Sequence, residues 1–442
     1  MPGRATAVAT GEVKAVDPAS SELWEPTGPT RSDESGEYRR GGWRELFGNR
    51  RFLLLETSGT LAGAGYAVYS VAVLYLAYGL TGNLLVAGTV LFVEYGVYTA
   101  TFLIAPLVDR ARDKRTVLLV CYPIQVAAAA ALALALRSGT LTVPLLLGLV
   151  LLLAVLWDFV WAVFMIAPRI VLEKRQLFVA NGFSNVVSVG TQVGGYAGGG
   201  ALVYLVGPAG GASAYAVLLL GALVAALPLA LRVERAPRTP FAETFRRGWD
   251  AFRGRAGRSM RALAGVEVVV GFFGAVPPLL ITAVAYQRFS DPAAVYGPLV
   301  TAYALGGSLA GVVVGHLNPR RRVGLILVLT PIVAGAALFA LEGSGASPLF
   351  LAGALAVVGG ALSVRYTAKY GWVQGSFPSE LLGRVTANLY LFTGVAGSLA
   401  VLLVGTLSER FSLGTLESLT GLGLVAGGLL AVAVPFVRRM AF

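Results

Sequence analysis

Six ionisable residues inside long apolar stretches are the side chains of this sequence that could do chemistry. They are Glu56, Glu94, Asp158, Glu267, Arg365 and Lys369. A charged group in apolar surroundings is costly, so such a residue normally has a function or a partner there. Burial favours the neutral form of a carboxylate, which lets a buried acid exchange a proton near neutral pH. We expect this chemistry first at Glu94 and Asp158, which lie deepest, and then at Glu56 and Glu267.

A structural role competes with this interpretation at three of the six positions. Glu56, Glu267 and Lys369 lie a turn or two from the end of their stretches, where an ion pair or a side chain reaching the membrane surface explains them equally well. Aromatic residues are dense in the same stretches, and most of them are expected to pack or to face lipid. We include Trp161 among the candidates that line an apolar pathway.

Enzymatic and metal chemistry find little support. The chain has one histidine, His316, and one cysteine, Cys121, which exclude a multi-histidine metal site and an internal disulfide. None of its four lysines follows a glycine, so the phosphate-binding loop of common ATPases is absent. We therefore expect no enzyme and no cofactor, and any uphill movement of a solute must use an ion gradient.

Composition points to a membrane protein. Of 442 residues, 56% are hydrophobic and 13% are charged, whereas soluble domains run at ~45–50% and ~25%. At ~20 residues per span, this apolar content is sufficient for about twelve transmembrane helices. The predicted spans are 52–79, 84–108, 115–136, 142–166, 178–206, 212–231, 262–286, 294–317, 323–342, 348–370, 386–408 and 414–437.

The basic residues set the orientation. They gather before the first span, in the even-numbered connections and after the last span, whereas the odd-numbered connections hold only Arg137, Arg288 and Arg410. Cytoplasmic loops collect Lys and Arg, so both termini are predicted to be cytoplasmic in a multi-pass plasma-membrane protein. The same bias explains the net charge of +12, and we expect no nucleic-acid partner.

The chain divides into four parts and its two halves repeat. The parts are a disordered tail (1–45), a six-helix bundle (46–232), a cytoplasmic linker with an amphipathic helix at 241–252 (233–261) and a second six-helix bundle (262–442). Ala180-Asn181 matches Ala387-Asn388 at an offset of 207 residues, and the same offset places Asp158 on Arg365. The sequence therefore predicts an all-α protein with two pseudo-symmetric bundles.

Two features of the helices concern packing and bending. Glycines at four-residue spacing in the fifth span, including Gly190, Gly194 and Gly198, suit a close approach of two helices. Pro277-Pro278 in the seventh span interrupts the helical hydrogen bonds and predicts a kink that could serve gating.

Residues 105–115 resemble a family signature. This stretch, APLVDRARDKR, is similar to the loop between spans two and three of the major facilitator superfamily, Gly-x-x-x-Asp-Arg-x-Gly-Arg-Lys/Arg-Arg/Lys. The matching residues are Asp109, Arg110, Lys114 and Arg115, while Ala105, Arg112 and Asp113 depart from the pattern. The resemblance implies a charge cluster that latches the two halves in the outward-facing state.

The fifth span resembles the antiporter motif of that family's drug exporters, Gly-x-x-x-Gly-Pro-x-x-Gly-Gly. The matching residues are Gly190, Gly194, Gly198 and Gly199, with Gly195 in place of the proline. The loops at Pro168-Arg169 and Gly383-Arg384 resemble the macrolide-efflux type of drug/proton antiporter. The family's fold implies that spans one, four, seven and ten surround a central cavity, onto which Asp158 and Arg365 would both face.

These observations lead to a functional hypothesis. We expect a monomeric transporter in the lipid bilayer that exports small amphipathic, drug-like compounds, cationic or neutral, in exchange for protons, as in drug resistance. A second possibility is a transporter of an anionic metabolite, such as a siderophore, that binds through Arg365 and Lys369. A third is a membrane sensor or scaffold that binds a partner through residues 1–40 and the 241–252 helix.

Overall fold

The computed structural model describes residues 43–232, 254–317, 322–343, 347–376 and 379–438. Every regular element within these ranges is a helix. Most of the predicted N-terminal tail and the predicted amphipathic helix at 241–252 lie outside the described residues.

The first half of the chain forms one bundle. Its helices are α1 (Trp43–Gly48), α2 (Arg50–Thr81), α3 (Leu84–Thr99), α4 (Thr101–Arg110), α5 (Lys114–Arg137), α6 (Val143–Ile166), α7 (Pro168–Val171) and α8 (Lys174–Ala226). Asn49 begins α2, since its side chain accepts hydrogen bonds from the amides of Arg51 and Phe52, both at 3.1 Å. Gly82 ends it with φ of 66°, a left-handed conformation that glycine adopts without strain.

The long helix α8 contains two predicted spans. Its direction changes at Gly207, where φ is 72° and ψ is 179°, and Pro208 follows. A proline cannot supply the amide that would continue the helical hydrogen bonds, and only glycine adopts this backbone conformation readily. The break lies where spans five and six were predicted to separate.

The second half forms the other bundle. Its helices are α10 (Gly254–Gly274), α11 (Pro277–Arg288), α12 (Pro292–Leu317), α13 (Val323–Gly343), α14 (Pro348–Ser376), α15 (Ser379–Leu407), α16 (Leu413–Ala433) and α17 (Pro435–Arg438). The seventh span is broken between α10 and α11 at the predicted place, because Pro277 and Pro278 occupy the first turn of α11. α10 begins at Gly254 rather than near residue 262.

The helices have the length and apolarity of membrane spans. Among the described residues, ten helical segments of 18 residues or more are apolar enough to cross a bilayer, and one of them, Val179–Ala226, includes both arms of α8. The second span is made of the shorter apolar helix α3 followed by α4, which are separated at Ala100. The prediction of an all-α protein built from twelve spans in two six-helix bundles is confirmed.

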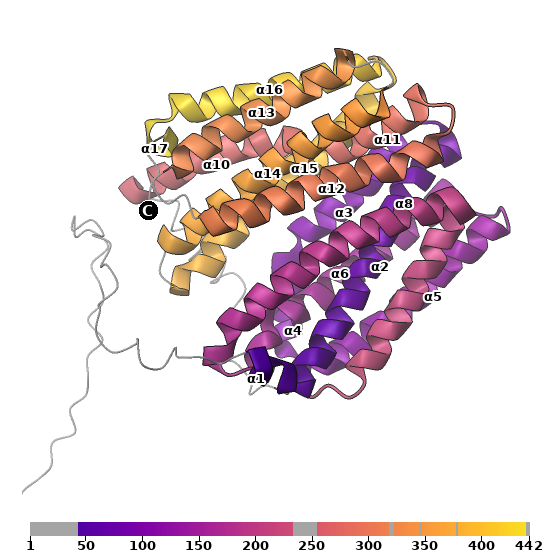
Figure 1. Ribbon diagram of the computed structural model, residues 1–442, viewed down its shortest axis with the longest axis vertical. Helices are drawn as coiled ribbons and strands as arrows, with labels where there is room; N and C mark the ends of the chain where they lie inside the picture. The colour runs from indigo at the N-terminus through magenta and orange to yellow at the C-terminus, as the bar shows by residue number, and fades with distance from the viewer. Residues whose placement is uncertain (1–42, 233–253, 318–321, 344–346, 377–378, 439–442) are drawn as a thin grey trace, which may run out of the picture.

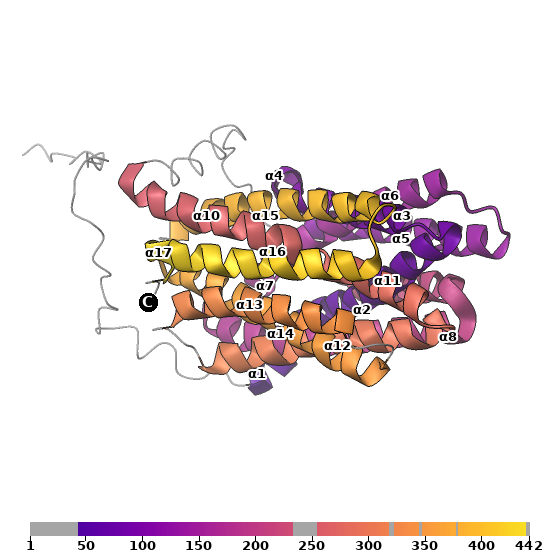
Figure 2. The same ribbon diagram turned by 90° about the horizontal axis from the view of Figure 1, so that it is seen from above.

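The two bundles lie side by side, with their helices running in roughly one direction (Figure 1). Seen from above, α1 and α17 lie toward one end of the molecule, and α11 and the labelled part of α8 lie toward the other (Figure 2). The bundles meet through α3 with α15 and through α8 with α12. The backbones of the two halves approach closely at two places, Gly88 against Val401 and Gly200 against Gly297. Both places lie toward the end away from α1 and α17.

Candidate functional site

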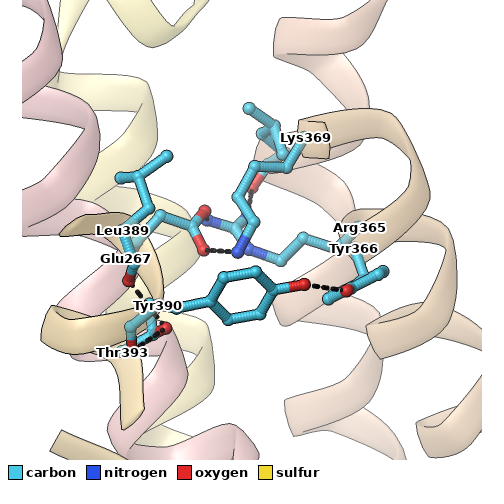
Figure 3. Close-up of polar contacts among 8 residues, drawn as sticks. Glu267, Arg365, Tyr366, Lys369, Leu389, Tyr390 and Thr393 are labelled. Carbon is cyan, nitrogen blue, oxygen red and sulfur yellow. Dashed lines mark hydrogen bonds and ion pairs between the residues drawn. The ribbon is translucent and has the colours of Figure 1, made fainter. Parts of the chain in front are cut away.

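A buried charge cluster joins α10 to α14 in the second bundle. Glu267 accepts from Arg365 Nη2 at 2.5 Å through one carboxylate oxygen and from Lys369 Nζ at 2.8 Å through the other (Figure 3). Arg365 also donates from Nη1 to the carbonyl oxygen of Leu327 on α13. The exposed fractions are 3% for Glu267, 3% for Arg365 and 6% for Lys369. The structural interpretation, an interhelical ion pair, therefore holds for Glu267 and Lys369.

Four tyrosines in mutual contact lead from Lys369 to the other bundle. Lys369 Nζ lies 4.6 Å from the ring centroid of Tyr370 and 5.8 Å from that of Tyr366. Tyr390 of α15 stacks on Tyr370 with centroids 5.0 Å apart. Its hydroxyl forms a hydrogen bond with that of Tyr366 (Figure 3). Tyr98 of α3 meets the edge of Tyr390 at 5.8 Å, which carries the aromatic cluster across to the first bundle.

Sequence reasoning did not single out Tyr366, Tyr370 or Tyr390. The spacing of the first two could have indicated their role. Tyr366 and Tyr370 are four residues apart with Lys369 between them, which places all three on one helical face. Tyr390 has no such signal, since its position depends on how α15 packs on α14.

Asp158 in the first bundle is a buried acid that, unlike Glu267, has no cationic partner among the described residues. Asp158 of α6 is 2% exposed and accepts a hydrogen bond from the Thr101 hydroxyl of α4 at 2.7 Å. Tyr98 lies near enough to interact electrostatically with Asp158 and with Tyr366. Among the described residues, no Lys or Arg lies within ion-pair distance of Asp158. Asp158 and Arg365, which the repeat relates, thus have different partners and form no ion pair with each other.

Glu94 of α3 is buried in the neighbourhood of several tyrosines. It is 9% exposed, and its Oε1 atom has no hydrogen-bond partner in the described part of the chain. Tyrosines from four helices lie within electrostatic range of its carboxylate, namely Tyr66, Tyr69, Tyr95, Tyr196, Tyr215 and Tyr296. Tyr69 and Tyr215 stack at 5.1 Å, and Tyr66 stacks on Trp157 at 4.4 Å.

The remaining pathway candidates are less buried. Glu56 of α2 accepts a hydrogen bond from the Ser184 hydroxyl of α8 at 2.7 Å. The Trp161 side chain is 40% exposed, against 2% for Asp158 one turn earlier on the same helix. The structure does not bring Glu56 or Trp161 into contact with the charge cluster of the second bundle.

The predicted latch residues make their contacts inside the first bundle. Lys114 Nζ donates to the carbonyl oxygens of Val108 at 2.8 Å and Asp109 at 2.9 Å, which closes the C-terminal end of α4. Asp113, which replaces a basic residue of the signature, caps α5 and lies 3.8 Å from Arg232. Asp109 and Arg110 are exposed. Arg115 follows the cap, and its backbone amide donates to Asp113 at 3.0 Å.

The glycines of the fifth span divide into two groups. A methyl group at Gly190, Gly194 or Gly198 would meet no atom within 4 Å. One at Gly199 would lie 3.0 Å from the α2 backbone at Val68, and one at Gly195 would lie 2.6 Å from Ala67. The close approach of α8 to α2 therefore depends on Gly195 and Gly199, and the glycine that departs from the antiporter motif is one of the two.

No group of three or more His, Cys, Asp or Glu side chains suited to a metal ion occurs among the described residues. A search with protein-family models finds no match, and a search of curated proteins finds no similar sequence.

Solved structures share the architecture closely. The nucleoside transporter NupG superposes with a TM-score of 0.67 at 14% identity, over 87% of this chain and 98% of that one. PepTSo, a POT family transporter, gives 0.69 at 11% identity over 87% and 97%. A POT family transporter in complex with 5-aminolevulinic acid gives 0.66 at 10% identity over 87% and 96%. Such identities speak for the fold alone, so the chain is a multi-pass membrane protein with the fold of major facilitator transporters.

Proposed function

We propose that this protein is a proton-coupled secondary transporter that exports small amphipathic organic compounds by alternating access. The observation that carries the proposal is the pair of acids in the first bundle, Glu94 and Asp158. Both are buried, and neither has a cationic partner among the described residues. A buried carboxylate without a counter-charge is costly to keep ionised, so it serves well as a group that takes up and releases a proton during a transport cycle.

Alternating access is supported by the uneven contact between the bundles. Tyr286, Gly88 and Gly200 join the halves toward the end away from the termini. With the termini predicted in the cytoplasm, this arrangement corresponds to a state closed toward the outside. Lys114, a predicted latch residue, makes its contacts within the first bundle, as expected if the latch between the halves engages only in the opposite state.

The proposed cargo follows from the chemistry between the bundles. Tyr98 and Tyr366 are 43% and 48% exposed next to the ring of Tyr390, and they offer flat apolar surface with hydroxyl groups. Such a surface suits compounds that combine a ring or chain with polar groups. Export, rather than uptake, is proposed from the glycine pattern of the fifth span, and protons are the proposed coupling ion.

Reconstitution in liposomes tests the proposal. The vesicles carry a pH dye inside, and a panel of amphipathic fluorescent dyes serves as cargo under an imposed pH gradient. We expect wild-type protein to move a dye and protons in opposite directions, and Asp158→Asn or Glu94→Gln to uncouple the two fluxes. Glu342→Gln, at an exposed acid near the end of α13, is the matched control and should leave coupling unchanged. Unchanged coupling in the double variant Glu94→Gln/Asp158→Asn would contradict the proposal.

A further inference from the structure

The charge cluster of the second bundle carries one positive charge more than it balances. Glu267 is the only carboxylate within ion-pair distance of Arg365 or Lys369 among the described residues, so two cations share one anion. All three side chains are at most 7% exposed. An uncompensated buried charge is costly, and the rings of Tyr366 and Tyr370 near Lys369 compensate only part of it.

Two hydrogen-bond donors of the same cluster are also unused. Arg365 Nε and the Tyr370 hydroxyl are buried, and neither has a hydrogen-bond partner in the described part of the chain. Arg365 is 3% exposed and Tyr370 is 8% exposed, so solvent does not readily satisfy them. Buried donors are normally paired, and an unpaired one costs free energy. Excess positive charge and free donors together describe a site that lacks its anion.

We propose that this cluster binds a carboxylate group of the transported compound, so that the cargo is an amphipathic organic acid. The proposal rests on the transport function above and adds the chemical class of the cargo. A carboxylate carries one negative charge and accepts several hydrogen bonds, which matches one excess positive charge and the free donors of Arg365 and Tyr370. A phosphate dianion would exceed that charge.

The surroundings of the cluster provide the amphipathic part of the recognition. Tyr390 stacks on Tyr370, and Tyr98 of the other bundle contacts Tyr390. Tyr366 and Tyr98 keep nearly half of their surface exposed. A compound whose carboxylate reaches the cations would place its apolar part on these rings, in contact with both bundles.

Binding to the purified protein tests the proposal without any transport step. The probes are 3-phenylpropionate, the neutral 3-phenylpropan-1-ol and inorganic phosphate, each titrated while thermal unfolding of the full-length chain is followed. We expect 3-phenylpropionate to raise the unfolding temperature in a saturable way and the alcohol to raise it much less. Tyr370→Phe should weaken binding of the acid by roughly tenfold or more, since it removes a donor to a charged group but keeps the ring.

We expect Tyr370→Phe to fold like wild type, so that a loss of binding in this variant can be interpreted. The Tyr370 hydroxyl lies near that of Tyr390 but makes no well-formed hydrogen bond to a described residue, so the variant should unfold close to the wild-type temperature when no probe is present. Tyr204→Phe, on an exposed tyrosine of α8, is the matched control and should bind like wild type.

Several results would overturn the proposal. They are no saturable shift with 3-phenylpropionate, equal shifts with the acid and the alcohol, equal shifts with phosphate, and unchanged binding in Tyr370→Phe. Proton-coupled dye transport that persists alongside any of these results would leave the transport function intact and reject only the carboxylate site. Carboxylate binding without any coupled flux would do the reverse.

Discussion

The Tyr286 hydroxyl of α11 donates a hydrogen bond of 2.8 Å to the backbone carbonyl oxygen of Tyr75 on α2, and so joins the two bundles. The ring of Tyr286 also lies 4.8 Å from that of Tyr75 and 4.6 Å from that of Tyr78, between centroids. Asn83 adds a polar contact to Glu409 at 3.1 Å near the same end. Aromatic packing and a few hydrogen bonds therefore hold this end together, which suits the opening that the proposed transport cycle requires.

Replacing Tyr286 by Phe should weaken this closed end. The variant keeps the ring contacts and loses one hydrogen bond, worth about 0.5–1.5 kcal/mol, so the closed-to-open ratio should fall by roughly 2- to 12-fold. Spin labels at Arg112→Cys and Arg322→Cys, both exposed near the opposite end, report the change in a Cys121→Ala background. We expect a new population with a shorter distance between the labels.

The control for this experiment is Tyr204→Phe, which removes a hydroxyl from an exposed position on α8. It should leave the distance distribution unchanged. If Tyr286→Phe also leaves it unchanged, the hydrogen bond to Tyr75 does not contribute to closure.

Adding a methyl group at Gly88 should disfavour the same closed state more strongly. A β-carbon there would lie 2.6 Å from the backbone oxygen of Val401 on α15, and a backbone atom cannot move aside as a flexible side chain can. Gly88→Ala should reduce transport and shift the label distances toward the other state. Gly148→Ala on α6, where a methyl group meets nothing within 4 Å, is the control and should transport like wild type.

Neutralising Glu267 and neutralising Glu94 should have different effects on stability. Glu267→Gln leaves Arg365 and Lys369 without their anion and should destabilise the protein by about 3–5 kcal/mol, the cost of breaking a buried ion pair. Glu94→Gln removes a charge that has no cationic partner among the described residues and should be neutral or stabilising. Thermal unfolding of the two variants at neutral pH checks this contrast. Equal losses of stability would show that Glu94 has an ionic partner in solution.

Arg288 and Glu417 should behave as a coupled pair. Arg288 Nη2 lies 2.5 Å from a carboxylate oxygen of Glu417, which is fully buried in α16, and Nη1 donates to Leu341 on α13 at 2.9 Å. Arg288→Met alone should destabilise by about 3–5 kcal/mol, because the charge of Glu417 stays buried without its partner. Glu417→Leu alone should cost less, because the Arg288 side chain is 18% exposed. The double variant should recover most of that loss, as measured by a double-mutant cycle. Additive losses would mean that the two side chains act independently.

The spans could be predicted because each depends on local composition. The kink at Pro277-Pro278 and the break at Gly207 follow from residue types that interrupt helical hydrogen bonds wherever they occur. The division of the second span at Ala100 carries no such residue, and it was not anticipated.

The candidate site was only partly predictable, because partners depend on the depth and rotation of packed helices. Six charged positions were identified as candidates, yet the sequence could not show that Arg365 pairs with Glu267 rather than with Asp158. The same limit applies to Tyr390, which reaches Tyr370 only through the packing of α15 against α14.

The break at Pro277 gives the seventh span a mechanical property. Glu267, which holds the two cations, lies on α10 before the break, and Tyr286, which touches the other bundle, lies on α11 after it. The two helices of this span can therefore change their relative angle at the proline pair. A ligand that draws Arg365 or Lys369 away from Glu267 would move α10. The movement would tilt α11 and break the contact of Tyr286 with α2.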